Sequence, residues 1–346
     1  MERLRWPRWM PVDPYILLLL GTVGLAALIP AQGVAAHVAS GASTAAIAFL
    51  FFLYGARLST HEALAGLRHW RLHVTVLACT FVIFPLLGLA ARGLVPVLLT
   101  HDLYTGLLFL TLVPSTIQSS IAFTSIARGN VPAAICAGSF SSLAGIVITP
   151  VLAAALLGNS GGGFSADSLI KIVLQLLVPF LAGQVLRRWI GGFITRHRKV
   201  LGLVDRGSIL LVVYTAFSEG MVQGIWHRVS PLRLGGLLVV EAALLAVMLA
   251  LTWYGGRALG FGREDRIAIQ FAGSKKSLAS GLPMASVLFG AHASLAVLPL
   301  MLFHQMQLMV CAVIAKRRSH DARRPAVSPG SAAASQTAVG TATRSD

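Results

Sequence analysis

The chain is short of charged residues. Only 12% of its 346 residues are Asp, Glu, Lys or Arg, whereas soluble domains carry about 25%. Hydrophobic residues make up 56% of the chain, and its mean hydropathy is +0.77. This composition excludes an ordinary soluble domain and indicates an integral membrane protein whose main partner is the lipid bilayer.

Acidic residues are scarcer still, with 12 Asp and Glu against 28 Lys and Arg, so the net charge is +16. In a soluble protein such an excess would suggest nucleic-acid binding. Here the basic residues cluster between apolar runs, so we predict no nucleic-acid partner and interpret them as signals of membrane orientation.

Cysteine is rare and has no metal-binding spacing. Cys79, Cys136 and Cys311 all lie in apolar segments, which predicts small core residues. The sequence also lacks a nucleotide-binding P-loop and the HExxH and GxSxG motifs. A primary pump in one chain is therefore excluded. A membrane enzyme that uses Lys and His at the interface has no visible catalytic set, so we predict neither an enzyme, nor a metal site, nor a cofactor.

Ten apolar segments predict an all-α integral membrane protein with ten transmembrane helices. Each can cross about 30 Å of hydrocarbon at a rise of about 1.5 Å per residue. The first resembles a signal peptide as well, and we interpret it as an uncleaved helix. The predicted spans are 14–30, 42–57, 72–94, 104–126, 131–156, 168–189, 206–225, 233–256, 266–290 and 293–315.

Basic residues follow every second predicted span, whereas the loops between are nearly free of them. Examples are Arg57 after the second span, Arg128 after the fourth and Lys316 after the tenth. Cytoplasmic loops hold the excess of Lys and Arg. The pattern therefore predicts a multi-pass protein of the cell membrane with both termini in the cytoplasm.

The fourth and ninth spans are interrupted near their middle. The fourth reads LLFLTLVPSTIQSSIAFTSIARGN and the ninth contains FAGSKKSLASGLP. Irregular backbone at membrane depth survives only inside protein or beside water. We predict helix breaks at Pro114, Gly273, Gly281 and Pro283.

The two interrupted spans hold the same place in two halves of five spans. Five is odd, so the second half enters the membrane from the opposite side, which is typical of an inverted-repeat transporter. We therefore predict a cytoplasmic N-terminus (1–13) and a transporter domain (14–316), followed by a disordered cytoplasmic tail (317–346). The repeats within the domain are about 14–156 and 168–316.

Two adjacent lysines lie inside the ninth span. A lysine in hydrocarbon costs at least about 2.5–3.5 kcal/mol, and Lys275 lies roughly 12 Å deep by helix rise. The lysines would therefore bind an anion or act as permanent counter-charges. The predicted substrate and ion site comprises Thr116, Gln118, Ser119, Ser120, Ser274, Lys275, Lys276 and Ser277.

Three further polar residues are candidates for coupling: Glu219, Glu241 and His304. Glu241 would either pair with a lysine of the ninth span or carry a proton. Glu219 would either do the same or lie at the outer interface. His304 is either a packing residue or a proton relay.

With these motifs in view, the chain resembles the bile acid:sodium symporter family, and within it the bacterial members related to the solute carrier family 10 member 7 branch. The stretches that carry the resemblance are FLYGARLS, VPSTIQSSIAFTSIARGN, GIVITPVL, LVVYTAFSEGM, FAGSKKSLASGLPMA and LMLFHQMQL. It implies ten helices in a panel and a core subdomain, with the broken helices crossing. It also implies symport of a small organic anion, such as a bile acid or steroid conjugate, with sodium as the driving ion.

The chain departs from the family pattern where the family's bile-acid transporters bind sodium. Their Ser-Asn pair of the fourth helix corresponds to Ser119 and Ser120, and their Glu and Gln of the ninth helix correspond to Phe271 and Lys275. One alternative is therefore a proton-coupled or uncoupled anion transporter in which Lys275 replaces the sodium ion. A membrane regulator that does not transport, or a channel, would be further alternatives. The sequence gives no oligomeric state.

Overall fold

The computed structural model describes residues 14–57, 69–157, 166–222, 224, 230–289 and 293–321. Within them the secondary structure is entirely helical. The elements are α1 Pro14–Leu28, α2 Gly33–Arg57, α4 Trp70–Ala78, η2 Cys79–Ile83, α5 Phe84–Ala90, η3 Ala91–Leu94, α6 His101–Leu112, α7 Ile117–Ile126, α8 Val131–Leu157, α9 Ala166–Arg196, α10 Arg198–Val222, α11 Pro231–Ala258, α12 Arg263–Gly273, α13 Leu278–Phe289 and α14 Ala293–Asp321.

Six helical segments of the described residues are long and apolar enough to cross a membrane, and α6 with α7 makes a seventh if the bent pair is one span. The protein is therefore a multi-pass membrane protein. The three other predicted spans fall on the short apolar helix α1, on α9, and on the pair α12 and α13. The count of ten spans and the inverted repeat stay predictions.

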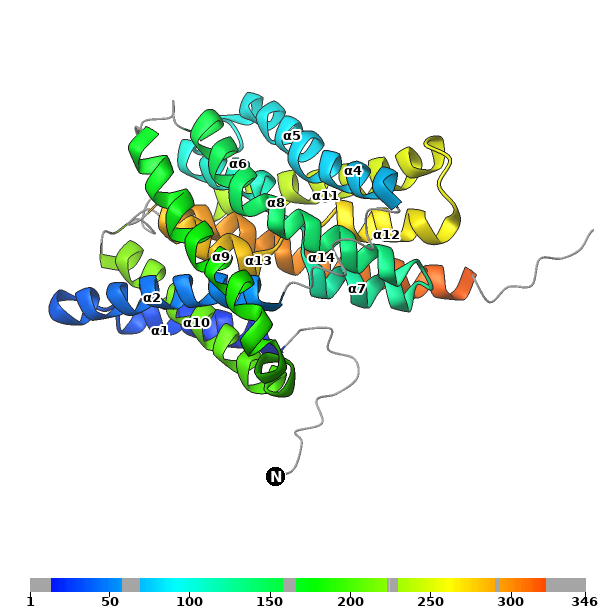
Figure 1. Cartoon of the computed structure of the whole chain (residues 1–346). Coiled ribbons are helices and arrows are strands. Elements are labelled where there is room, and N and C mark those ends of the chain that lie inside the picture. Colours follow the sequence, from blue (N-terminus) through cyan, green and yellow to red (C-terminus); the bar gives the residue numbers. More distant parts are fainter. Residues whose placement is uncertain are drawn as a thin grey trace, which may run out of the picture.

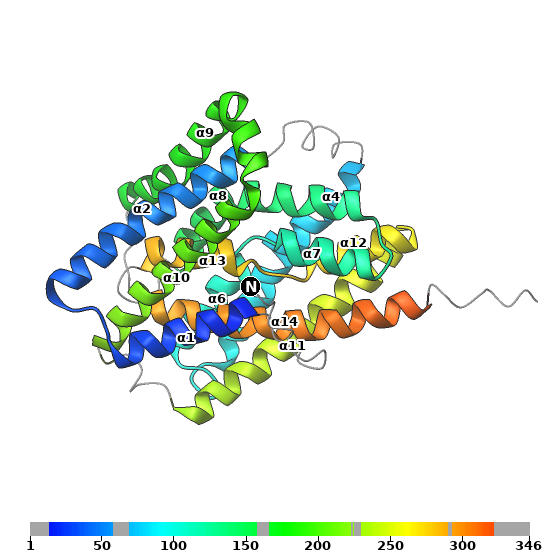
Figure 2. The same ribbon diagram turned by 90° about the horizontal axis from the view of Figure 1, so that it is seen from below.

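The helices form two groups. α2 packs on α9 and α10, and α1 packs on α10; we call these four helices the panel. The remaining helices pack mainly on one another and form the core. Figures 1 and 2 show α1, α2 and α10 together on one side of the molecule, away from α4, α7 and α12. The panel meets the core where α10 contacts α13 and α14 and where α9 contacts α8.

Glycines bring α2 and α9 into backbone contact. A Cβ atom added to Gly55 would lie 2.0 Å from the carbonyl oxygen of Phe180, and one added to Gly183 would lie 2.1 Å from that of Phe52. Small residues at helix interfaces allow such approach in membranes. Gln184 Nε2 also donates to the Gly55 carbonyl at 2.6 Å, which adds a hydrogen bond between the two helices.

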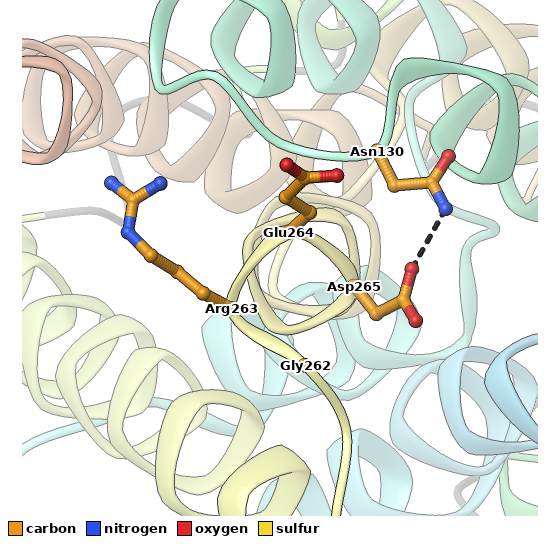
Figure 3. A pocket seen from close by; sticks show the side chains of 5 residues that line it. All are labelled: Asn130, Gly262, Arg263, Glu264 and Asp265. Carbon is orange, nitrogen blue, oxygen red and sulfur yellow. Dashed lines mark hydrogen bonds between the residues drawn. The ribbon is translucent and has the colours of Figure 1, made fainter. Parts of the chain in front are cut away.

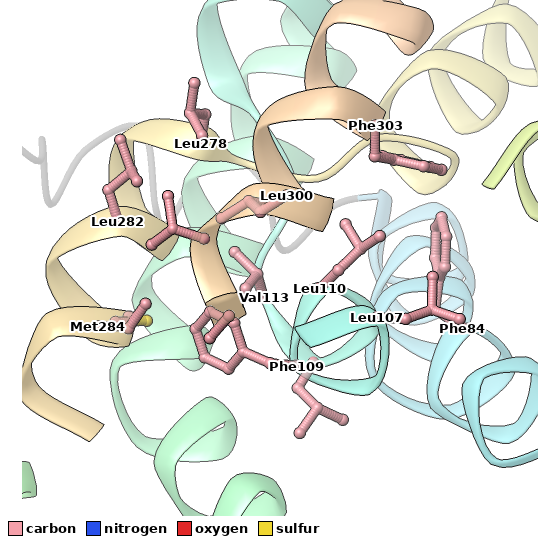
Figure 4. Packing of buried hydrophobic residues seen from close by; sticks show 14 of the residues in the cluster. Phe84, Leu107, Phe109, Leu110, Val113, Leu278, Leu282, Met284, Leu300 and Phe303 are labelled. Carbon is pink, nitrogen blue, oxygen red and sulfur yellow. The ribbon is translucent and has the colours of Figure 1, made fainter. Parts of the chain in front are cut away.

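Apolar side chains fill the core around both interrupted spans. Figure 4 shows Val113 close to Leu300 and Phe109, with Leu278 and Leu282 of α13 on the other side of α14. All five are buried. The predicted packing role of two cysteines is also confirmed, because the thiols of Cys79 and Cys311 are free and buried in this core.

Two of the four predicted helix breaks are wrong. Gly281 and Pro283 lie inside α13. Gly281 serves close packing instead, since a Cβ atom there would lie 2.4 Å from Leu300 Cδ2 and 3.0 Å from Val113 Cγ1. Pro283 is tolerated because buried membrane helices accommodate a missing backbone donor through their surroundings.

The predicted disordered tail begins too early. α14 continues to Asp321, because Arg318 has partners there. Its guanidinium lies 3.0 Å from the Trp253 ring centroid, and its Nε donates to Gln270 Oε1 at 3.1 Å. Residues 1–13 and 322–346 lie outside the described residues.

Candidate functional site

The breaks in the two interrupted spans touch each other. α6 and α7 are bent by 65° at residues 113–116, and residues 274–277 separate α12 from α13. The Ser277 N–H donates to the Pro114 carbonyl at 2.8 Å, and Thr116 Oγ1 donates to the Lys276 carbonyl at 2.7 Å. The interruptions lie at Pro114 and directly after Gly273, and the two segments form a crossing.

Hydroxyl groups at the start of α7 bind the end of α12. Ser115 Oγ donates to the Ala272 carbonyl at 2.5 Å. Ser120 Oγ shares its one proton between the Thr116 carbonyl, at 2.5 Å, and the Phe271 carbonyl, at 3.0 Å. The last carbonyls of a helix lack partners within it. Ser120, which we predicted to hold a ligand, therefore closes the crossing, as does Thr116.

Ser274 and Ser277 serve their own helix ends. Ser274 Oγ donates to the Gln270 carbonyl at 2.6 Å, one turn earlier in α12. Ser277 Oγ accepts from the Ser280 N–H at 3.2 Å, which is the geometry of an N-cap on α13. Their hydroxyls are thus committed to the local backbone.

The ammonium of Lys276 is fully buried and fully hydrogen-bonded. Its Nζ atom donates to the carbonyl oxygens of Thr80, Thr111 and Val113 at 2.9, 2.6 and 2.8 Å. It also lies 4.2 Å from the centroid of the Phe84 ring. An ammonium has three donors, and all three have acceptors here. We call this set of three oxygens the carbonyl cage.

A proline frees one oxygen of the cage. In the π-helical turn η2 the Phe84 N–H bonds the Cys79 carbonyl, and the next residue, Pro85, has no N–H to give. Pro85 therefore cannot donate to the Thr80 carbonyl.

The other two cage oxygens lie at the end of α6. The Ser115 N–H, which would continue the helix to Thr111, donates to Ser141 Oγ at 2.9 Å instead. Val113 follows the last residue of α6. The three carbonyls thus point to one place, and the negative end of the α6 dipole favours a cation there.

Gln307 of α14 holds the backbone of Lys276 on both sides. Its Oε1 accepts from the Lys276 N–H at 2.9 Å, and its Nε2 donates to the Lys276 carbonyl at 2.8 Å. The same Nε2 lies 2.8 Å from His304 Nδ1, so His304 belongs to the crossing network. The sequence shows Gln307 only as a polar residue in an apolar span.

Lys275 contrasts with its neighbour. Its side chain is also fully buried, but among the described residues its Nζ atom has no hydrogen-bond partner. It lies 3.8 Å from the Phe123 ring centroid and 5.7 Å from that of Phe271. Ser119 Oγ, one turn before Phe123 on α7, also lacks a partner. Gln118 is exposed and lies outside the buried network.

The predicted ion pair between Glu241 and a lysine of the ninth span is not present in the described part of the chain. The Glu241 side chain is fully buried, and neither carboxylate oxygen has a hydrogen-bond partner there. The lysines use carbonyls and aromatic rings instead. Glu219 is exposed near the end of α10, which favours the interfacial interpretation over a role in coupling.

A surface hollow of about 460 Å³ lies at the other end of α12, beside Gly262, Arg263 and Glu264. Figure 3 shows Asn130 bonded to Asp265, at 2.7 Å, while Arg263 points away. Asn130 Oδ1 also caps α8. These groups join α8 to α12, and about 16 Å of helix separates them from the lysines. Among the described residues no cluster of His, Cys, Asp or Glu could hold a metal ion.

Comparisons with known proteins point to one group. Residues 13–320 match the model of the SBF-like CPA transporter family. The chain is 56% identical to an uncharacterised protein of Pseudomonas aeruginosa over 90% of this chain and 94% of that one. It is 48% identical to YfeH of Escherichia coli, a candidate symporter, over 88% and 92%. It is 29% identical to sodium/bile acid cotransporter 7 of Rattus norvegicus over 91% and 93%.

Proposed function

Because the chain belongs to the SBF-like CPA transporter family, we propose that it is a secondary transporter of a small organic anion that works by alternating access. Its named relatives are a symporter candidate and a cotransporter, not enzymes. We propose that the anion binds at the crossing, beside Lys275.

The observation that carries this proposal is that the Lys275 ammonium has no hydrogen-bond partner in the part of the chain that the structure describes. A buried charge without a hydrogen-bonded partner is costly, and intramembrane ionisable residues mark sites of function. Lys276 next to it has three acceptors, so the lack of acceptors distinguishes Lys275 from its neighbour in the described part of the chain. The anionic group of a ligand would supply the missing partner, and Ser119 Oγ would add a donor from α7.

The surroundings of Lys275 suit an anion with an apolar body. The N-termini of α7 and α13 meet at the crossing, and the positive ends of helix dipoles attract anions. The rings of Phe123 and Phe271 offer apolar contact beside the charge. A bile acid or steroid conjugate combines these two properties and is the class to test first.

For the motion, we propose that the panel rocks against the core around the crossing. The first two predicted spans of each half form the panel, which supports a 5+5 inverted repeat of ten spans. We propose the cell membrane as its location, with both termini in the cytoplasm, on the distribution of basic loops. Sodium is the coupling ion in the name of the rat relative; in this chain the cage of Lys276 supports the alternative without sodium at the crossing.

A Lys275→Gln variant is expected to lose anion binding and transport. Hydrogen bonds to a charged group contribute about 1.5–3 kcal/mol, so the apparent affinity should fall roughly 10–100-fold. The measurement is uptake of labelled taurocholate and of a panel of steroid sulfates into liposomes that contain the purified protein, with binding followed by the shift in melting temperature.

The matched control is Lys316→Gln, because Lys316 is exposed on α14 away from the crossing. It should transport as the wild type does. Equal affinity in Lys275→Gln and wild type would contradict the role of Lys275. A wild-type chain that binds and transports no anion of the panel would favour a regulator that does not transport.

A further inference from the structure

The surroundings of the Lys276 ammonium have the composition of a site for a monovalent cation. Its three oxygen neighbours are all backbone carbonyls, at 2.6–2.9 Å from Nζ. Rings of backbone carbonyls bind bare monovalent cations in channels, where they replace the hydration shell. The distances also match charge-assisted N–H···O bonds.

The cage is assembled from two parts of the core, η2 and the end of α6. Thr80 belongs to η2, Thr111 to α6, and Val113 to the break before α7. Lys276 itself comes from the second break. Figure 4 shows Phe84 and Val113 of this region within the packed apolar cluster.

Three carbonyl oxygens turned toward one another repel unless a positive charge lies between them. In this chain the charge is covalently attached. Lys276 Nζ is fully buried, and the backbone of Lys276 is fixed by Gln307 on both sides. The residue that carries the charge is therefore held in place beside the cage.

We propose that Lys276 is a built-in cation: its ammonium occupies a monovalent-cation site formed by the carbonyl oxygens of Thr80, Thr111 and Val113, and this site takes no sodium ion in the wild-type chain. The sequence pointed to Lys275 as the residue that replaces sodium, and the contacts assign this role to Lys276. The consequence for coupling rests on the proposed function: an anion carrier with a tethered cation moves no sodium through this position.

The test is thermal unfolding of the purified full-length chain in detergent, with no substrate added. Melting temperatures are compared in sodium chloride, in n-butylammonium chloride and in N-methylglucamine chloride at equal ionic strength. N-methylglucamine is too large for the cage, whereas n-butylammonium reproduces the side chain of lysine. Wild type, Lys276→Ala and Lys275→Ala are measured side by side.

Wild type should melt at the same temperature in all three salts. Lys276→Ala should melt about 5–10 °C lower in N-methylglucamine, because the carbonyls lose their buried partner. At least half of this loss should return in n-butylammonium or in sodium, since a cation that binds only the folded state stabilises it. The Lys275 ammonium does not lie in the carbonyl cage. The melting temperature of Lys275→Ala should therefore not rise with either cation.

A sodium-specific rise in the melting temperature of the wild type would overturn the proposal. An unchanged melting temperature of Lys276→Ala in N-methylglucamine, or a loss that no cation restores, would do the same. If Lys276→Ala folds only when it is extracted with n-butylammonium or sodium present, the proposal is supported; if it folds in none of the salts, it is overturned. These results do not depend on transport, so a failure of the proposed function is seen separately in the uptake measurement.

Discussion

A Gly55→Ala variant is expected to be destabilised by about 2 kcal/mol, although alanine is the better helix former. The added methyl group would lie 2.0 Å from the Phe180 carbonyl oxygen, so α2 and α9 must separate. Overpacking of this kind costs about 3 kcal/mol, which exceeds the gain of about 1 kcal/mol in helix propensity. The measurement is the melting temperature in detergent, together with the fraction of protein that elutes as a single species.

Gly41→Ala is the matched control on the same helix. No atom lies within 4 Å of a Cβ atom added to Gly41, so only the gain in helix propensity applies. The two substitutions should therefore have opposite signs, with Gly41→Ala at or above the melting temperature of the wild type. If Gly55→Ala melted as high as Gly41→Ala, the close contact between α2 and α9 would be refuted.

The second large effect is expected for Gln307→Leu. The substitution removes the acceptor of the buried Lys276 N–H and one donor to the Lys276 carbonyl, which keeps its hydrogen bond from Thr116 Oγ1. An unsatisfied buried polar group costs about 1–3 kcal/mol, so the loss of the acceptor for the Lys276 N–H should destabilise the fold by about that amount. Thermal unfolding measures this loss. The melting temperature of Gln307→Glu should lie between those of the wild type and Gln307→Leu, because glutamate keeps the acceptor oxygen and loses the N–H donor.

Gln305→Leu is the control, two residues away on α14. Gln305 is half-buried and its Oε1 has no hydrogen-bond partner among the described residues. It should therefore change the melting temperature little. Similar losses of melting temperature in Gln305→Leu and Gln307→Leu would mean that any leucine in this part of α14 destabilises the fold. The hydrogen bonds between Gln307 and Lys276 would then not explain the effect.

The crossing itself could be predicted from the sequence because its cause is local. Pro114 removes a helix donor, and glycine and serine around residue 273 weaken the ninth span. The positions of both breaks follow from these residues. The predicted breaks at Gly281 and Pro283 were wrong, because glycine and proline also occur inside closely packed helices.

The separate roles of the two lysines could not be predicted, because they depend on carbonyls far away in the chain. Every residue has a carbonyl, so sequence does not show which of them lack partners. Pro85 was the available signal, since it deprives the Thr80 carbonyl of a donor. The serine hydroxyls were predicted to bind a ligand, but they donate hydrogen bonds to backbone carbonyls instead. Each irregular segment leaves carbonyl groups that need a donor.

The carbonyl cage also bears on how the chain enters the membrane during synthesis. The segment from α12 to α13 carries two lysines at an insertion cost of about 2.5–3.5 kcal/mol each, and it is not among the segments that pass as spans by apolarity. Thr80, Thr111 and Val113 are all translated before Lys276. When the lysine leaves the ribosome, the acceptors of its charge are thus already available in the bilayer. Gln307 emerges about thirty residues later. The last span therefore binds the backbone of Lys276 after the earlier spans have bound its ammonium.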